Sequence, residues 1–174
     1  MTDRRWRLVV HGGAGSMRPG RLDPEQERCA RAGLEAALAA GAAVLDKREH
    51  ALDAVAAAVR VLEEDPCFNA GRGSVLTASG CIELDAAIMD GRTRAAGAVA
   101  GLRTTRAPVL LARRLLEEGP HVFLSGKGAD EFARDHQFEQ VENSWFEVAE
   151  RRRQLDEFMG EGGFDDEVKY GTVG

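Results

Sequence analysis

Phe68-Asn69-Ala70-Gly71-Arg72-Gly73 lies where the predicted structure changes from helix to strand. Before this loop, apolar residues recur at helical spacing over residues 52–62. Asp65-Pro66 ends that helix, because the residue before a proline disfavours helical backbone. After the loop, residues 73–77 and 81–89 carry a strand pattern. The loop therefore joins a helix to a group of strands.

Other segments extend this pattern in both directions along the chain. The small residues from Ala95 to Ala100 leave little side-chain volume on their strand, so a neighbouring element must approach its backbone closely. The other predicted elements are a strand at 7–10, a helix from Pro24 to about Lys47, a turn at Asp90-Gly91, a strand at 94–102, a helix at 108–118, a strand at 121–124, a turn at Gly126-Lys127-Gly128, a helix at 129–134, and a helix capped by Ser144 that runs to Phe158.

This order of elements predicts a layered α+β fold rather than a doubly wound sheet. A length of 174 residues with 44% hydrophobic residues favours one domain with its own core. We assign residues 1–159 to that domain. Residues 160–171 are predicted to be a flexible linker, because glycines alternate there with acidic residues.

Charge and hydropathy argue against several classes of function. A net charge of −6 does not suit a nucleic-acid surface, which needs clustered lysines and arginines. Arg151-Arg152-Arg153 is flanked by acidic residues and is interpreted as a solvated helix face. No secretory signal is visible, and the alanine-rich stretch at 36–45 is too short to span a bilayer. The sequence predicts a soluble cytoplasmic protein that binds neither nucleic acid nor membrane.

The three cysteines, Cys29, Cys67 and Cys81, give no sign of a metal or redox site. They are odd in number and lack the paired spacing C-x-x-C. We expect reduced thiols that pack as small apolar groups.

Thr172, which follows Gly171, is a candidate nucleophile. A threonine at a newly formed amino terminus is activated by its own α-amino group, whose reference pKa of about 7.7 to 8.0 lets it accept the hydroxyl proton. A preceding glycine adopts, at low steric cost, the unusual backbone geometry in which the Thr172 hydroxyl attacks the Gly171 carbonyl. A threonine beside a glycine is, on its own, an ordinary turn residue.

Taken together, Gly171-Thr172, the turn His11-Gly12-Gly13-Ala14-Gly15 and the loop at 68–73 resemble the plant-type (type 2) isoaspartyl peptidase/L-asparaginase family. The resemblance covers essentially the whole chain. It implies the α-subunit part of a precursor that cuts itself between Gly171 and Thr172. It also implies the αββα sandwich of amino-terminal nucleophile hydrolases, of which this chain would form the amino-terminal half only, with residues 172–174 at the start of the nucleophile strand.

The resemblance implies roles for further residues. Asn69 would contact the nucleophilic threonine, and Gly12 and Gly13 would help to shape the active site. No catalytic cofactor is implied, but a structural sodium ion is, and backbone carbonyl oxygens suit such a hard cation. The carbonyls concerned map onto Leu62, Glu63, Asp65, Phe68, Ala70 and Arg72.

Residue chemistry leaves simpler interpretations open. An asparagine followed by small residues is also ordinary turn chemistry, and a glycine turn can cradle an anion. His11 is expected to be a packing or hydrogen-bonding residue, because an amino-terminal nucleophile carries its own base. Glu83 and Asp85 alternate on a strand, and a solvent-facing edge is expected there rather than an acid–base pair.

The implied reaction is hydrolysis of L-asparagine or of isoaspartyl dipeptides through an acyl-enzyme. The implied assembly is an (αβ)2 dimer in which the partner is the chain's own carboxy-terminal β part. Substrate-gripping residues would follow Thr172, so the 174 residues alone are expected to be inactive and to expose an unpaired sheet edge. The alternatives are an inactive product, a small α+β binding module that uses the Gly12–Gly15 turn, or another threonine hydrolase such as a glycosylasparaginase or a threonine aspartase. The sequence does not distinguish asparagine from isoaspartyl substrates.

Overall fold

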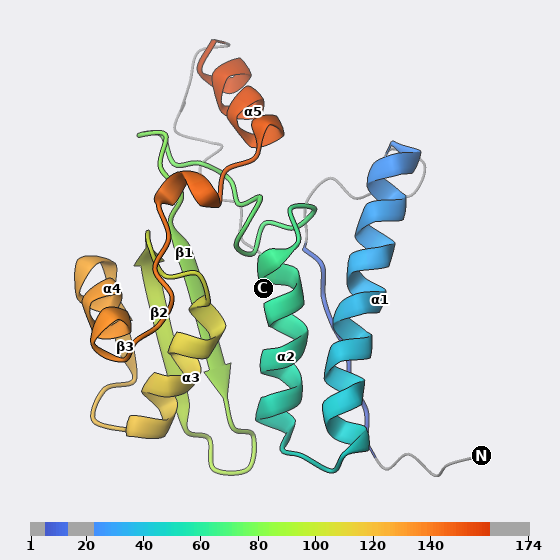
Figure 1. The fold of residues 1–174 in the computed structure, drawn as a ribbon, viewed down its shortest axis with the longest axis vertical. Helices are drawn as coiled ribbons and strands as arrows, with labels where there is room; N and C mark the ends of the chain where they lie inside the picture. Colours follow the sequence, from blue (N-terminus) through green and yellow to red (C-terminus); the bar gives the residue numbers. More distant parts are fainter. Residues whose placement is uncertain (1–5, 14–22, 161–174) are drawn as a thin grey trace.

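The computed structural model describes residues 6–13 and 23–160 of the chain (Figure 1). Helices and strands alternate in it without forming a doubly wound sheet, so the prediction of an α+β fold is confirmed. The elements in chain order are α1 (Pro24–Asp46), α2 (Ala51–Glu64), β1 (Leu84–Met89), β2 (Ala96–Leu102), α3 (Pro108–Glu118), β3 (Phe123–Ser125), α4 (Gly126–Asp135), the 3-10 helix η1 (Asn143–Trp145) and α5 (Ala149–Gly160).

The described strands form one three-stranded sheet in the order β1-β2-β3. β1 and β2 are an antiparallel pair in which Met89 lies opposite Ala96. β2 and β3 are parallel, with Ala98 opposite Phe123. The parallel pairing follows from the connection, because the chain leaves β2 and returns through α3 before it enters β3.

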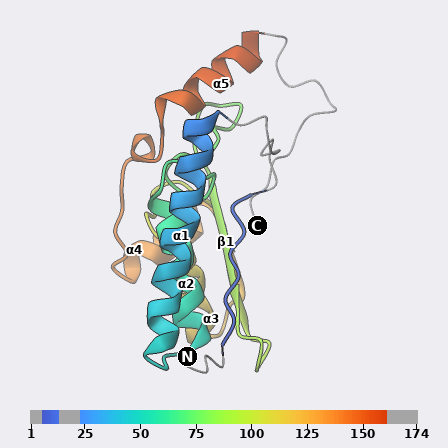
Figure 2. The ribbon, with the colours of Figure 1, turned by 90° about the vertical axis from the view of Figure 1, so that its right-hand side faces the viewer.

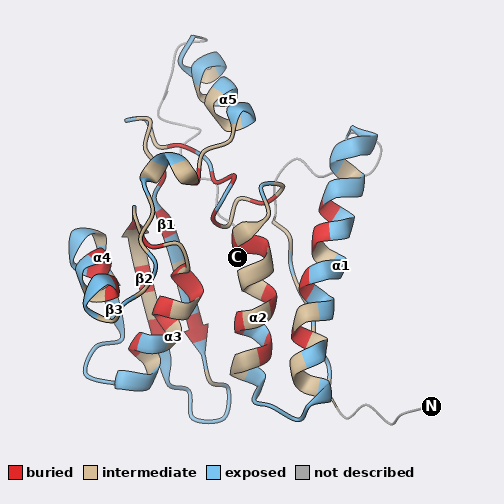
Figure 3. Cartoon of the chain, in the orientation of Figure 1, coloured by how far each residue is buried: buried red, intermediate tan, exposed pale blue. Residues whose placement is uncertain are grey.

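Helices cover one face of this sheet. Apolar side chains of α3 and α4, among them Leu111 and Ala133, share one buried cluster with Ile88 and Val99 of the sheet. Figure 2 shows α3 and α4 on the same side of β1, and Figure 3 shows buried residues both on these helices and on the strands. The opposite face of β1 is exposed, with Met89 60% accessible. The described residues thus supply one sheet and one helical layer, and they leave the expected αββα sandwich untested.

The prediction that an element approaches the small residues of β2 is confirmed at Gly97. A Cβ atom at this position would overlap the carbonyl oxygen of Ala112 and lie 2.6 Å from the backbone nitrogen of Leu116, both on α3. The absent side chain lets α3 pack directly against the strand backbone.

A second buried cluster lies between α1 and α2. Ala37, Ala58, Leu62 and Phe68 form it, and Val10 packs against its edge. α2 therefore faces α1 on one side and α3 and the sheet on the other. This second cluster connects the segment at 6–13 to the loop that follows α2.

Two predicted strands are wrong in the described structure. Residues 7–10 lie outside any strand, and residues 73–77 contribute only an isolated bridge between Leu76 and Ile82. A strand pattern in the sequence becomes a strand only where a partner completes the hydrogen-bond ladder. β1 likewise begins at Leu84 rather than at residue 81.

Three predicted boundaries also need correction. The Gly126-Lys127-Gly128 segment is the first turn of α4 rather than a separate turn. Ser144 lies inside η1, and α5 begins only at Ala149. The turn at Asp90 is present, but it extends to Ala95, whose carbonyl accepts the Asp90 N–H at 2.9 Å, so β2 starts at Ala96.

Candidate functional site

The segment from Asp65 to Ser74, called here the Asn69 loop, is held by backbone hydrogen bonds at several points. Pro66 lacks an N–H group and cannot continue α2. The Arg72 N–H then donates to the Glu63 carbonyl at 2.7 Å, and the Gly73 N–H donates to the Phe146 carbonyl at 2.7 Å. The loop is thereby tied both to the end of α2 and to the residue after η1.

Glycine is required twice in this loop. A Cβ atom on Gly71 would overlap the Glu63 carbonyl oxygen and lie 2.9 Å from the Glu63 Cα. Gly73 has a φ of +86°, a conformation that other residues rarely adopt, and it lies against the backbone of Pro66. These close approaches fix the loop backbone on the carboxy-terminal side of Asn69.

Asn69 is half-buried, and its two polar atoms have different surroundings. Its Oδ1 accepts the N–H of Val75 at 2.9 Å, which is the turn chemistry that the sequence left open. No acceptor among residues 6–13 and 23–160 receives a hydrogen bond from its Nδ2. The side chain is therefore held by its oxygen while its nitrogen remains able to donate.

The glycine turn that begins at His11 packs against this loop. A Cβ atom on Gly12 would lie 3.1 Å from Cε1 of Phe68 and 3.2 Å from Cδ2 of Leu34. His11 Nδ1 accepts the N–H of Gly13 at 3.1 Å, as expected for a hydrogen-bonding histidine. Two motifs more than 50 residues apart in sequence are thus brought into contact. Gly171 and Thr172 lie outside the described residues, as do Ala14 and Gly15.

The carbonyls suggested for sodium lie at the end of α2 and in the Asn69 loop. In a continuing helix, the Leu62 carbonyl would accept the N–H of the residue four positions later. That residue is Pro66, which has no N–H group, so the Leu62 carbonyl lacks its helical donor. The carbonyls of Glu63 and Asp65 accept the N–H groups of Arg72 and Phe68 at 2.7 and 3.1 Å. A carbonyl oxygen has a second lone pair, so these two bonds are compatible with cation binding. The donor chemistry fits a hard cation.

The side chain of Glu63 was missed by sequence reasoning, which considered only its carbonyl. It is 2% exposed and accepts the N–H of Val109 at 2.8 Å and a charged hydrogen bond from Arg60 at 2.8 Å. Burial raises the pKa of Glu63 to about 7, although both hydrogen bonds oppose the rise. Glu63 connects α2 to the first turn of α3, and no local sequence signal predicts that contact.

The arginine run at 151–153 is only partly a solvated face. Arg153 is exposed and pairs with Glu150 and Glu157 on its own helix. Arg151 instead donates from Nε to the Gly73 carbonyl at 2.8 Å, and Arg152 donates to the Gly80 carbonyl at 3.2 Å. The prediction is wrong for these two residues, because their partners lie more than 70 residues away in the sequence.

Glu83 and Asp85 are both exposed and take separate partners. Arg103 donates from Nε to Glu83 at 3.0 Å, and the Gly101 N–H donates to Asp85 at 2.8 Å. The structure therefore supports a solvent-facing edge rather than an acid–base pair. Glu83 and Arg103 also line an open hollow of about 590 Å³, which extends to Lys127 and Asp130 of α4. Asn69, Gly12 and Gly13 are not part of it.

Two of the three free cysteines are neighbours. Cys29 of α1 and Cys67 of the Asn69 loop lie close together, whereas Cys81 lies outside this pair. Burial and the neighbouring Cys29 thiol raise the pKa of Cys67 to about 12, so Cys67 is a neutral thiol at pH 7. Cys29 is exposed, which corrects the expectation that it packs as a small apolar group.

A known protein family matches nearly all of this chain. The pattern of the family described as Asparaginase matches residues 4–172, so the chain belongs to this family. A putative isoaspartyl peptidase/L-asparaginase of Dictyostelium discoideum is 46% identical over 148 residues, which cover 85% of this chain and 43% of that protein.

Two further relatives come from a bacterium and an archaeon. The isoaspartyl peptidase of Escherichia coli is 42% identical over 96% of this chain and 55% of that protein. The plant-type L-asparaginase of Pyrococcus abyssi is 45% identical over 86% of this chain and 47% of that protein. The chain spans about half the length of the curated relatives it matches.

None of the helices within residues 6–13 and 23–160 is both long enough and apolar enough to cross a bilayer.

Proposed function

We propose that the chain supplies the α part of a threonine hydrolase that acts on isoaspartyl dipeptides and L-asparagine. The observation that carries this proposal is the packing of Gly12 against Phe68, beside Asn69. A family match that extends to residue 172 and relatives named for these two activities support it. The proposed nucleophile is Thr172, freed by self-cleavage after Gly171.

In this proposal the described residues position groups around the threonine. Asn69 Nδ2 donates a hydrogen bond to the nucleophile, while Oδ1 stays bound to the Val75 N–H. Gly12 and Gly13 form the neighbouring wall, and the missing side chain of Gly12 lets Phe68 and Leu34 pack against the backbone there. The α-amino group of Thr172 serves as the base, and water releases aspartate from the acyl-enzyme.

A sodium ion is proposed at the carbonyls of Leu62, Glu63, Asp65, Phe68, Ala70 and Arg72. It would supply positive charge that fixes the loop backbone, and it would take no part in proton transfer. The remaining substrate-binding groups are proposed to come from a β part that begins at Thr172 and assembles with the α part as an (αβ)2 dimer. A soluble protein of the cytoplasm fits this proposal.

The test is the intact mass, under denaturing conditions, of protein expressed from the complete reading frame. We expect two products, one that ends at Gly171 and one that begins at Thr172, together with hydrolysis of isoaspartyl dipeptides. Thr172→Ala should give one uncleaved product, whereas Thr93→Ala, in the exposed turn after β1, should be cleaved normally. Uncleaved wild-type protein without amidase activity would contradict the proposal and leave the binding module as the explanation. Cleavage with activity only on glycosylated asparagine would point to a glycosylasparaginase.

A further inference from the structure

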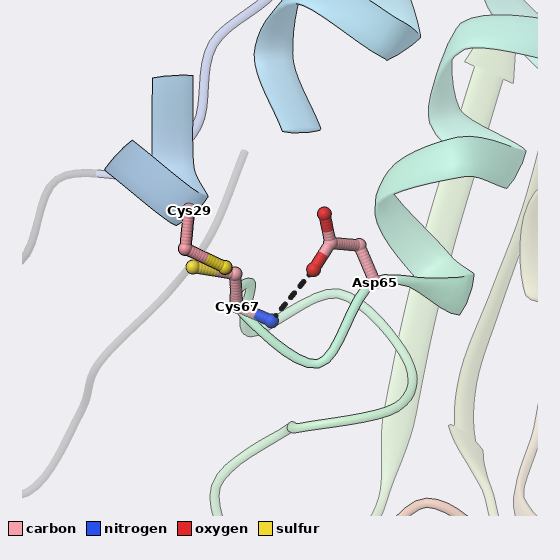
Figure 4. A group of neighbouring side chains, drawn as sticks. All are labelled: Cys29, Asp65 and Cys67. Atoms are coloured by element: carbon pink, nitrogen blue, oxygen red, sulfur yellow. Dashed lines mark hydrogen bonds between the residues drawn. The ribbon is translucent and has the colours of Figure 1, made fainter. Parts of the chain in front are cut away.

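Cys29, Asp65 and Cys67 form a cluster of potential metal ligands. One ligand atom from each residue lies within 4.8 Å of the others, and Figure 4 shows the two sulfur atoms beside each other, next to the Asp65 carboxylate. Cys29 lies on α1, and the other two residues lie in the Asn69 loop. The cluster therefore joins two segments that are 36 or more residues apart in sequence, which explains why ligand spacing gave no signal.

The carboxylate is already oriented. Asp65 Oδ1 accepts the N–H of Cys67 at 2.9 Å, which holds one cluster residue against another. Gly33 lies one helical turn after Cys29, and a Cβ atom there would overlap Oδ2 of Asp65. The Asp65 side chain thus occupies the space that a missing side chain leaves on α1. Outer contacts of this kind orient the groups that bind a metal.

The ligand types select the class of ion. Two sulfurs and one carboxylate oxygen suit a borderline-soft divalent cation rather than sodium, calcium or magnesium. In a tetrahedral zinc site, bonds of about 2.3 Å place two sulfurs roughly 3.8 Å apart, which falls within the observed cluster size. Cys29 is exposed and the other two residues are half-buried, so the ion can reach the cluster and water can occupy the fourth position.

We propose that Cys29, Asp65 and Cys67 bind one divalent cation of the zinc class and thereby clamp α1 to the Asn69 loop. Each thiol releases its proton to solvent when the ion binds, because a coordinating thiol is deprotonated. Two thiolates, one carboxylate and the ion then carry a net charge of −1. This site uses side chains, whereas the sodium ion is proposed at backbone carbonyls, one of which belongs to Asp65.

Co²⁺ is the probe for the first experiment. The full chain, reduced with a non-thiol reductant and freed of metal, is titrated with Co²⁺ while thiolate-to-cobalt charge-transfer absorption is recorded. We expect saturation at one ion per chain and loss of the absorption when Zn²⁺ is added. Cys29→Ser and Cys67→Ser should each lower Co²⁺ affinity by at least about 100-fold, the upper end of what an outer contact contributes.

Matched variants keep the test decisive. Cys81→Ser removes the third cysteine, which lies outside the cluster, and should leave the titration unchanged. Asp65→Asn should weaken binding while the charge-transfer absorption persists at saturating Co²⁺. Circular dichroism and the unfolding temperature of each metal-free variant establish that it folds. If Cys67→Ser does not fold, exposed Cys29→Ser carries the test by itself.

Two results would overturn the proposal. The first is the absence of charge-transfer absorption in the reduced wild-type chain, or absorption that Cys29→Ser and Cys67→Ser both retain. The second is a disulfide. Alkylation and peptide mapping of air-exposed protein would find Cys29 joined to Cys67, and the reduced chain would show no Co²⁺ site. The pair would then be a redox contact rather than a metal site.

Discussion

Asp130 of α4 accepts a hydrogen bond from the hydroxyl of Thr105 at 2.7 Å, and both residues are buried. The same carboxylate accepts three backbone N–H groups, from Arg103 at 2.9 Å, Thr104 at 3.3 Å and Thr105 at 3.2 Å. The chain between β2 and α3 is therefore held by one side chain that follows it in sequence by 25 residues or more. This contact fixes α4 over the end of the sheet.

Removing this carboxylate should destabilise the fold strongly. Asp130→Ala leaves four donors without their acceptor, and each buried unsatisfied donor costs about 1 to 3 kcal/mol before water enters. We expect a loss of about 3 kcal/mol or more in the free energy of unfolding, measured by urea denaturation. Asp135→Ala, at an exposed position on the same helix, should change it by no more than about 0.5 kcal/mol. Equal effects of the two substitutions would show that Asp130 does not hold the connection.

A methyl group on β2 should separate the strand from α3. Gly97→Ala would place its Cβ 2.6 Å from the Leu116 nitrogen and against the Ala112 carbonyl, both of them backbone atoms that cannot move alone. Overpacking of this kind costs about 1 to 3 kcal/mol or more. Gly91→Ala is the control, because no atom lies within 4 Å of its Cβ position. Thermal unfolding should show a markedly lower unfolding temperature for Gly97→Ala and little change for Gly91→Ala. A Gly97→Ala protein as stable as Gly91→Ala would contradict the packing.

The buried Glu63 should make stability depend on pH. Its pKa is about 7 in the folded chain and 4.5 as the reference value, so between these pH values the folded state binds more protons than the unfolded state. The stabilising contribution is complete below about pH 4.5 and is lost as pH rises through 7. The free energy of unfolding should therefore differ between these two ends of the pH range by on the order of 3 kcal/mol, at 1.36 kcal/mol for each pKa unit. Urea unfolding at a series of pH values should show this decline.

Glu63→Gln supplies the comparison for the pH series. The amide still accepts the Val109 N–H but does not titrate, so the decline between pH 4.5 and 7 should be absent from this variant. Wild-type stability that rises over the same interval would show that the hydrogen bond from Arg60 outweighs the burial of the carboxylate.

Local sequence signals predicted the ends of α2 and both ends of α3. α3 begins at Pro108 and ends before Gly119, as predicted, because proline suits the first helical turn and Gly119 adopts a left-handed φ of +83°. α2 stops before Asp65-Pro66 for the same kind of local reason. The positions of these helix ends depend on steric properties of the residues at the ends themselves.

Contacts between distant segments could not be predicted in this way. Residues 7–10 and 73–77 have a strand pattern, but no strand among the described residues pairs with them to complete a hydrogen-bond ladder. Arg151 bonds the Gly73 carbonyl across 78 residues, and Cys29 meets Cys67 across 38. Nothing in the local composition specifies such partners. The glycine turn and the Asn69 loop were predicted to share a site only through a family resemblance, and the structure shows Gly12 packed against Phe68.

Asn69 offers a way to separate a structural role from a catalytic one. Asn69→Asp keeps the oxygen that accepts the Val75 N–H and removes the Nδ2 donor, so we expect a free energy of unfolding within about 0.5 kcal/mol of wild type. Asn69→Ala removes both the oxygen and the nitrogen and should lower the free energy of unfolding by about 1 kcal/mol. Under the proposed function, both variants should slow isoaspartyl dipeptide hydrolysis by about 100-fold or more, which is the usual loss for one positioned donor.

Asn143→Asp is the contrasting control for these measurements. The Nδ2 of Asn143 donates to the carbonyls of Ile82 at 2.8 Å and Arg103 at 3.0 Å. Replacing this amide by a carboxylate should therefore lower the free energy of unfolding. Urea denaturation and initial rates on one dipeptide, measured on the same preparations of the complete protein, distinguish the two asparagines. An Asn69→Asp enzyme that is stable and fully active would leave Asn69 with a turn role only. An enzyme that is stable but inactive would identify Nδ2 as the group that acts on the nucleophile, because the oxygen contact is intact in that variant.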